Sequence, residues 1–217
     1  QAKEVQARVR EFVDNDLLPV INDYWERAEV PYELVPKLAA LNIAGGTIQG
    51  YGCPGLSRMS ASIAAAELAR GDGSINTFFG VHSGLAMGSI DMLGSEEQKQ
   101  RWLPAMAAGE AIGCFALTEP TAGSDPASME TFARRDGADW VLTGTKRWIG
   151  LASVAQVAVV WAQTDGGIRG FVVPTDTSGF TATPIEQKLS MRASIQCDID
   201  LDGVRLPADA VLPGAVG

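Results

Sequence analysis

The chain has 217 residues, of which 46% are hydrophobic and 20% are charged, and its formal net charge is −9 at pH 7. A chain of this size and apolar content buries a sizeable core, in one large domain or two small ones. The acidic balance argues against a nucleic-acid-binding protein, which needs a basic face, and leaves any anionic ligand to be attracted by local groups.

The three cysteines (Cys53, Cys114 and Cys197) are odd in number and follow no disulfide or metal-ligand spacing. We therefore expect reduced thiols in a cytoplasmic protein, with no metal site. We also expect no signal peptide and no membrane span, because no apolar run is long enough to cross a bilayer.

The first third of the chain has the composition and periodicity of helices. Helix formers of mixed charge occupy residues 3–13 and 16–28 around Pro19, and a short helix over 32–41 leads to the glycine pair 45–46.

Two further helices are predicted on either side of the breaker 70–73. Either Ser57 or Ser60 is the expected N-cap of the first helix. Ser74 is expected to open the second helix, which extends to Leu93. Apolar residues cover most of its circumference, which predicts a central, buried helix.

From Gly113 onward the hydrophobic period changes from helical to two, which indicates strands. Turns are predicted at Asp136-Gly137 and again at Thr143-Gly144. The expected strands cover residues 131–135, 140–142, 146–149, 157–162, 168–173 and 195–201. This shift places a domain boundary near residue 112, so we expect a helical domain over 1–112 and a β-domain over 113–217.

The segment 113–125 reads GCFALTEPTAGSD and passes from a short apolar strand into a polar turn. Gly123 permits backbone conformations that a side chain forbids, and Thr118 and Ser124 add hydroxyls that donate and accept. Such a segment can lay hydrogen-bonding groups along the edge of a flat, polar heterocycle. A plain strand followed by a turn is the alternative interpretation.

The segment 113–125 resembles the flavin-binding signature of the acyl-CoA dehydrogenase family, and residues 146–149 resemble its second flavin-contacting segment. The resemblance extends from about residue 41 to residue 217. It implies FAD as cofactor and an α+β fold: an all-helical N-terminal domain and a sandwich- or barrel-like middle domain of two packed sheets.

The family's C-terminal helical bundle has no counterpart here, so we expect either a fragment or a naturally truncated protein. The family usually assembles into homotetramers through that bundle, which predicts a homo-oligomer for the full-length protein.

The resemblance also implies roles for individual residues. The flavin-contacting positions are Phe115, Leu117, Thr118, Gly123, Ser124, Trp148, Ile149 and Gly150. The substrate-contacting positions are Asn76, Thr77, Val81 and Ser124. Trp148 is expected beside the flavin ring, with a buried core aromatic as the alternative. Many members have threonine where this chain has Gly150, and the missing hydroxyl leaves flavin tuning and reaction with oxygen open.

In the family, a glutamate removes the α-proton of an acyl-CoA thioester while a hydride passes from the β-carbon to the flavin. That glutamate comes from the C-terminal domain, so we expect no catalytic residue in this chain and no turnover by its 217 residues alone. Glu119 is expected to orient the signature turn through hydrogen bonds instead. His82, the only histidine, is expected to be a hydrogen-bonded core residue.

Within the family, the sequence most resembles the glutaryl-CoA dehydrogenase and short-chain acyl-CoA oxidase branches. The glutaryl branch holds the distal carboxylate of its substrate with an arginine where this chain has Asn76, followed here by Thr77. An asparagine carries no charge, which favours a short monocarboxylic acyl-CoA. Phe78 and Phe79 indicate either an apolar end of the substrate pocket or ordinary core.

The predicted function is therefore FAD-dependent α,β-dehydrogenation of a short-chain acyl-CoA to the 2,3-enoyl-CoA. An electron-transfer flavoprotein or dioxygen is expected as electron acceptor. The alternatives are a short-chain acyl-CoA oxidase and a non-catalytic partner subunit or binding module of the same fold.

Overall fold

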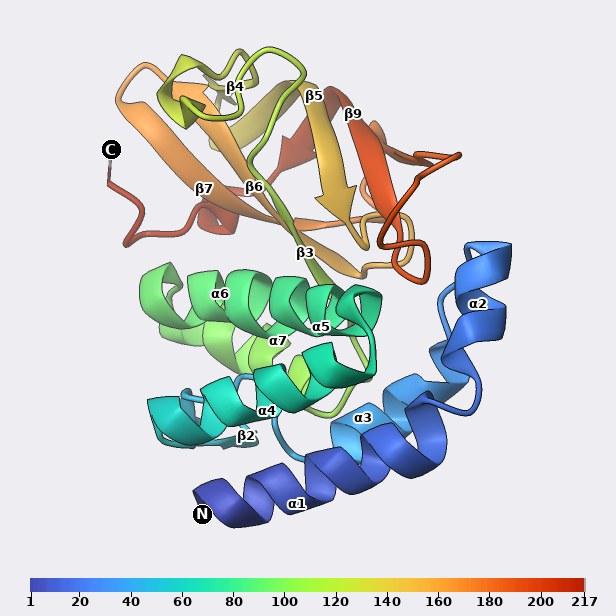
Figure 1. Cartoon of the computed structure of the whole chain (residues 1–217). Helices are drawn as coiled ribbons and strands as arrows, with labels where there is room; N and C mark the ends of the chain where they lie inside the picture. Colours follow the sequence, from blue (N-terminus) through green and yellow to red (C-terminus); the bar gives the residue numbers. More distant parts are fainter. Residues whose placement is uncertain (217) are drawn as a thin grey trace.

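A layer of helices packs beneath a curled β-sheet in the computed structural model, which describes residues 1–216 (Figure 1). The helical elements that precede the sheet are α1 (Ala2–Phe12), η1 (Val13–Leu17), α2 (Ile21–Arg27), η2 (Tyr32–Leu34), α3 (Val35–Ala40), α4 (Arg58–Gly71), α5 (Gly73–Phe79), η3 (Gly80–Met87), α6 (Gly88–Leu93) and α7 (Glu96–Ala107). Two short helical turns, η4 (Pro126–Ser128) and η5 (Ala208–Ala210), follow later in the chain. A small hairpin, β1 (Gln49–Gly50) and β2 (Cys53–Pro54), lies between α3 and α4. No helix in the described residues is both long and apolar enough to cross a bilayer.

The helices α5, η3 and α6 form one continuous run directly beneath the sheet (Figure 1). Ser57 caps α4 by accepting a hydrogen bond from the Ser60 N–H, as one of the two expected alternatives. Asp72, not Ser74, caps α5, because the Asp72 carboxylate accepts from the N–H groups of Ser74 and Ile75. A carboxylate at this position also interacts favourably with the positive end of the helix dipole. The prediction of a buried helix from Ser74 to Leu93 holds for one face of this run only, since Leu85 on η3 is exposed.

The β-domain is built from β3 (Gly113–Ala116), β4 (Phe132–Asp136), β5 (Asp139–Gly150), β6 (Val157–Thr164), β7 (Gly167–Pro174), β8 (Phe180–Pro184) and β9 (Gln196–Leu206). The order in the sheet is β3-β6-β4-β5-β9-β8, and β7 also pairs with β6, outside this order. The expected two packed sheets are thus one connected, seven-stranded sheet. β3 rises from the helices into this sheet and pairs in parallel with β6 (Figure 1).

The prediction of a turn at Thr143-Gly144 is wrong, because β5 continues through both residues as one strand. Gly144 lies instead at a register shift against β9, with a φ of +149°. A Cβ atom at Gly144 would come within 2.5 Å of the Thr131 hydroxyl, so the backbones approach here more closely than a side chain allows. A second register shift lies between Lys146 and Ile149.

The segment between β8 and β9 docks onto the helices. Arg192 donates hydrogen bonds to the carbonyls of Trp25 and Glu26, the last turn of α2, at 2.9 and 2.8 Å. Next to it, Met191 accepts a hydrogen bond from the Thr77 hydroxyl on α5, with 3.0 Å between Oγ1 and Sδ. One buried cluster of apolar side chains continues from the helices into the sheet. The sheet is therefore fixed against the face of α5 and η3.

Candidate functional site

The two segments singled out in the sequence lie side by side, at the end of β3 and near the end of β5. The N–H of Arg147 donates to the carbonyl of Thr118 over 2.8 Å. One residue earlier, the ammonium of Lys146 donates to the carbonyl of Leu117 over 3.0 Å. The tertiary fold thus joins the segments 113–125 and 146–149 directly through two hydrogen bonds.

A buried ion pair lies behind this junction. Lys146 is fully buried, and its ammonium is 2.8 Å from Glu119 Oε1. Glu119 also accepts hydrogen bonds from the N–H groups of Glu130 and Thr131, at 2.6 and 3.0 Å. Burial alone raises the pKa of Glu119, but the bonds from Lys146 and the two N–H groups outweigh it, so the pKa is lowered. Burial also lowers the pKa of Lys146, and Glu119 opposes that shift.

Glu119 therefore holds the signature turn in place, as expected from the sequence. It is only 4% exposed, and both of its oxygens accept hydrogen bonds. A carboxylate whose ionised form is stabilised in this way is a poor proton acceptor.

In contrast to its neighbours, Thr118 presents free hydrogen-bonding groups. Among residues 1–216, neither the N–H nor the hydroxyl of Thr118 has a hydrogen-bond partner. The following turn is closed on itself by a bond from the Glu119 N–H to the carbonyl of Ala122 at 3.0 Å. Thr118 is half-buried, so its unpaired groups face a partly enclosed surface. Beyond the turn, Gly123 and Ser124 are exposed.

Trp148 projects from β5 next to this surface. It is 64% exposed and has a φ of 60°, in the left-handed region that bulky residues avoid. The interpretation of Trp148 as a buried core aromatic is therefore wrong. The register shift between Lys146 and Ile149 re-aims the side chain, as bulges beside functional sites commonly do. The guanidinium of Arg147 lies 5.7 Å from the centre of the Trp148 ring.

The other positions of the two segments belong to the packing of the sheet. Ile149 is buried, and Leu117 is half-buried. The half-buried ring of Phe115 is tilted against Trp161, with 6.1 Å between ring centres. The side chain of Ile149 is thus enclosed by protein, which leaves its backbone as the part available for contact.

Two substrate positions from the sequence, Val81 and Thr77, lie where η3 and α5 meet the β-domain. A Cβ atom on Gly150 would be 3.2 Å from Val81 Cγ2, so these two residues pack directly against each other. Thr77 reaches the β-domain through Met191, as described above. Asn76 is half-buried beside Thr77. The fold thus joins Val81 to Gly150, whereas Ser124, the fourth substrate position, is exposed beyond the signature turn.

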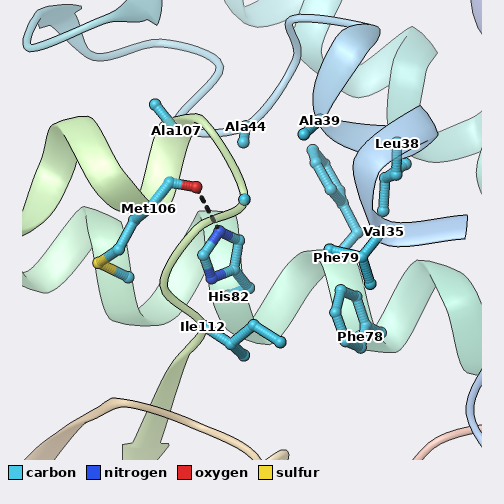
Figure 2. A pocket seen from close by; sticks show the side chains of 11 residues that line it. Val35, Leu38, Ala39, Ala44, Phe78, Phe79, His82, Met106, Ala107 and Ile112 are labelled. Atoms are coloured by element: carbon cyan, nitrogen blue, oxygen red, sulfur yellow. Dashed lines mark hydrogen bonds between the residues drawn. The ribbon is translucent and has the colours of Figure 1, made fainter. Parts of the chain in front are cut away.

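His82 is a satisfied core histidine, as expected (Figure 2). Its Nε2–H donates to the carbonyl of Met106 over 3.0 Å, and its Nδ1 accepts from the N–H of Gly113 over 3.1 Å. Burial lowers the pKa of His82, which favours the neutral ring that this pattern of one donor and one acceptor requires. His82 therefore anchors the start of β3 to the helices.

A small apolar cavity of about 20 Å³ lies beside His82 and is lined by residues of the N-terminal, largely helical part of the chain (Figure 2). Phe78 and Phe79 line it together with Val35 and Leu38 from α3. These two phenylalanines are ordinary core of the helical layer. The volume is close to that of a single water site, and the lining includes none of the candidate flavin residues.

Two connections were missed by sequence reasoning. The first connection is the ion pair between Lys146 and Glu119. A lysine on the inward face of a strand needs a buried partner of opposite charge, and this requirement is the signal that could have indicated Glu119. Arg192 gave no sequence signal for its bonds to α2, because its partners are backbone carbonyls far away in the chain.

Comparison with known proteins matches residues 1–110 to the N-terminal domain of acyl-CoA dehydrogenases and residues 114–204 to their middle domain. The human mitochondrial short-chain specific acyl-CoA dehydrogenase is 37% identical over 94% of this chain and 51% of its own length. The probable acyl-CoA dehydrogenase fadE25 of Mycobacterium leprae is 37% identical over 96% of this chain and 55% of its own.

Among solved structures, a glutaryl-CoA dehydrogenase from Mycobacterium smegmatis in complex with FADH2 superimposes with a TM-score of 0.98 and 53% identity. The match covers 100% of this chain and 56% of the M. smegmatis chain. The present chain thus spans about half the length of the curated relatives it matches. Since the two domain matches together cover most of its residues, the chain belongs to the acyl-CoA dehydrogenase family.

Proposed function

We propose that this chain provides the flavin-binding and acyl-CoA-binding parts of an FAD-dependent dehydrogenase of short-chain acyl-CoA thioesters. The helical part, residues 1–112, and the β-part, residues 113–217, act as the two walls of the site. The observation that carries the proposal is the pair formed by Thr118, with its free N–H and hydroxyl, and the exposed Trp148.

The residues present fit a flavin. A half-buried N–H without a partner is costly, and a polar heterocycle with acceptors on its edge satisfies both it and the Thr118 hydroxyl. A strained, 64% exposed tryptophan is equally unfavourable in water, and stacking of a flat ring against Trp148 removes that exposure. Exposed Gly123 and Ser124 leave the adjoining backbone open to a ligand.

When bound, FAD supplies a ring that accepts a hydride from the β-carbon of the acyl group. The chain's own residues orient the reactants: Thr118 fixes the ring edge, and Trp148 fixes its face. Val81 and Gly150 keep the junction of helix and sheet apolar, which excludes water from the reacting carbons. Glu119 does not remove the α-proton, because its oxygens are held by Lys146 and two backbone N–H groups.

For the acyl group, we propose a short monocarboxylic chain. Asn76 offers no charge to a distal carboxylate. The two cations of the segment that touches α5 are already engaged: Arg192 donates to the carbonyls of Trp25 and Glu26, and Lys188 donates to the carbonyl of Met191. A second carboxylate would lose its hydration without gaining a charged partner.

Reconstitution with FAD tests the first part of the proposal. We expect the complete protein that contains this chain to bind FAD non-covalently, seen as flavin absorbance that co-elutes with the protein. Trp148→Ala should weaken binding by about fivefold, since stacking on an aromatic ring contributes roughly 1 kcal/mol. The matched control is Trp102→Ala, which removes a half-buried tryptophan on α7 that belongs to neither flavin segment. Wild-type protein without flavin absorbance would refute the assignment.

Steady-state kinetics tests the substrate. We expect kcat/KM for butyryl-CoA to exceed that for glutaryl-CoA in the complete protein, and Asn76→Arg to shift this ratio toward glutaryl-CoA. Asn76→Gln serves as the control, because it changes length without adding charge. Parallel assays with an electron-transfer flavoprotein and with dioxygen identify the electron acceptor. A preference of the wild-type protein for glutaryl-CoA would contradict the role given to Asn76.

A further inference from the structure

Lys146 is among the largest fully buried side chains of the described residues and carries a charge. A buried ammonium is costly unless it is paired and hydrogen-bonded. Glu119 supplies the charge partner at 2.8 Å. The second strong bond of the ammonium goes to a backbone carbonyl, that of Leu117, at 3.0 Å. Charge pairing with Glu119 does not require this second bond, which acts directly on the backbone at Leu117.

The bond to the Leu117 carbonyl sets the direction of a neighbouring donor. The peptide between Leu117 and Thr118 is trans, so its C=O and N–H point in opposite directions. With the C=O held toward the interior by Lys146, the Thr118 N–H is turned toward the opposite side, where it meets no acceptor in residues 1–216. The carbonyl of Thr118 is held in turn by the Arg147 N–H at 2.8 Å. Lys146 and Arg147 thus fix the planes on both sides of Thr118.

We propose that Lys146 is a positioning residue for the flavin: by holding the Leu117 carbonyl, it aims the Thr118 N–H at an acceptor on the flavin ring edge. This inference rests on the flavin site of the proposed function and assigns to one buried side chain the orientation of its backbone donor. Glu119 has a different role, because it neutralises Lys146 and ties the turn to residues 130 and 131.

The difference between the two roles gives three informative variants of the complete protein. Glu119→Gln removes a charge and places an amide N–H₂ among donors, so it destabilises the turn while leaving Lys146 able to reach the Leu117 carbonyl. Lys146→Met removes the bond to Leu117 and leaves Glu119 without its cation. The double variant Lys146→Met with Glu119→Gln also lacks the bond to Leu117 but buries no unpaired charge, which restores folding if Lys146→Met alone is too unstable.

Three measurements separate positioning from stability: the FAD dissociation constant, the visible absorption spectrum of the bound flavin, and the melting temperature without FAD. We expect both variants that contain Lys146→Met to weaken FAD binding by about tenfold, as for one lost hydrogen bond. The absorption bands of the bound flavin should shift equally in these two variants. Glu119→Gln should retain the wild-type spectrum although its melting temperature falls. In the unmodified protein, FAD should slow hydrogen exchange at the Thr118 amide.

The opposite results overturn the inference. If the spectrum and affinity of all three variants change in proportion to their melting temperatures, Lys146 only stabilises the fold. A wild-type spectrum in the double variant, or unchanged exchange at Thr118 on adding FAD, also refutes the positioning role. Wild-type protein that binds no FAD overturns the proposed function together with this inference, and unchanged exchange at Thr118 also removes the role proposed for Thr118, whereas the results with the variants overturn the inference alone.

Discussion

Replacement of Arg192 by methionine tests how the β-domain is held against the helices. The Arg192 guanidinium donates to the carbonyls of Trp25 and Glu26 at 2.9 and 2.8 Å, and to that of Lys188 at 3.0 Å. It also lies 5.1 Å from the centre of the Trp25 ring. A cation at the carbonyl end of α2 adds hydrogen bonds to carbonyls of its last turn and interacts favourably with the helix dipole.

The expected loss of stability follows from these contacts. The two bonds to α2 contribute roughly 0.5–1.5 kcal/mol each after competition with water, and the cation–π contact adds about 0.5–1 kcal/mol. Arg192→Met should therefore lower the free energy of unfolding by about 2–3 kcal/mol, since methionine keeps part of the apolar packing on Trp25. For a chain of this length, that corresponds to a fall in Tm of about 4–12 °C.

Thermal unfolding and hydrogen exchange measure this effect. Exchange should become faster in α2 and in residues 185–195, the two segments that the guanidinium joins, while the center of the sheet keeps its protection. Arg27→Met is the matched control, because Arg27 pairs with Glu29 at 2.8 Å on the surface and contacts the ring of Tyr24. That change should lower the melting temperature much less, because an exposed ion pair contributes little to stability. Equal losses for both variants, or faster exchange spread over the whole chain, would refute the docking role of Arg192.

Two further predictions concern titratable groups. Hydrogen bonds, chiefly from Arg10, lower the pKa of Glu67 from 4.5 to about 2, against the effect of burial. Ionised Glu67 therefore stabilises the fold above pH 4.5, and this stabilisation is lost as the pH falls toward 2. The free energy of urea unfolding should depend less on pH in that window for Glu67→Gln than for the wild type. An unchanged pH dependence would contradict the role given to Glu67. Burial raises the pKa of Cys53 to about 11, so its alkylation by iodoacetamide at pH 8 should be much slower than that of a free thiol, whereas equal rates would show that the thiolate is accessible.

Much of the fold could be predicted from the sequence because its signals are local. The Ser57 cap depends on a side chain and an N–H three residues apart. The alternation of buried and exposed residues along β9 follows from the period of two in a strand. The burial of residues 157–160 in β6 follows in the same way from an uninterrupted apolar run. The family assignment likewise rested on residues adjacent in the chain, in two segments.

Only the tertiary structure decided how these segments combine. Lys146 bonds to Leu117 and Glu119, 29 and 27 residues earlier, and Arg192 bonds to Glu26, 166 residues earlier. Gly144 looked like a turn residue, but the approach of Thr131 makes it a bulge within a continuous strand. The exposure of Trp148 depends on another such shift in register. A residue's type restricts its possible partners, whereas long-range packing selects the partner, and here that selection turns the free groups of Thr118 and the ring of Trp148 outward.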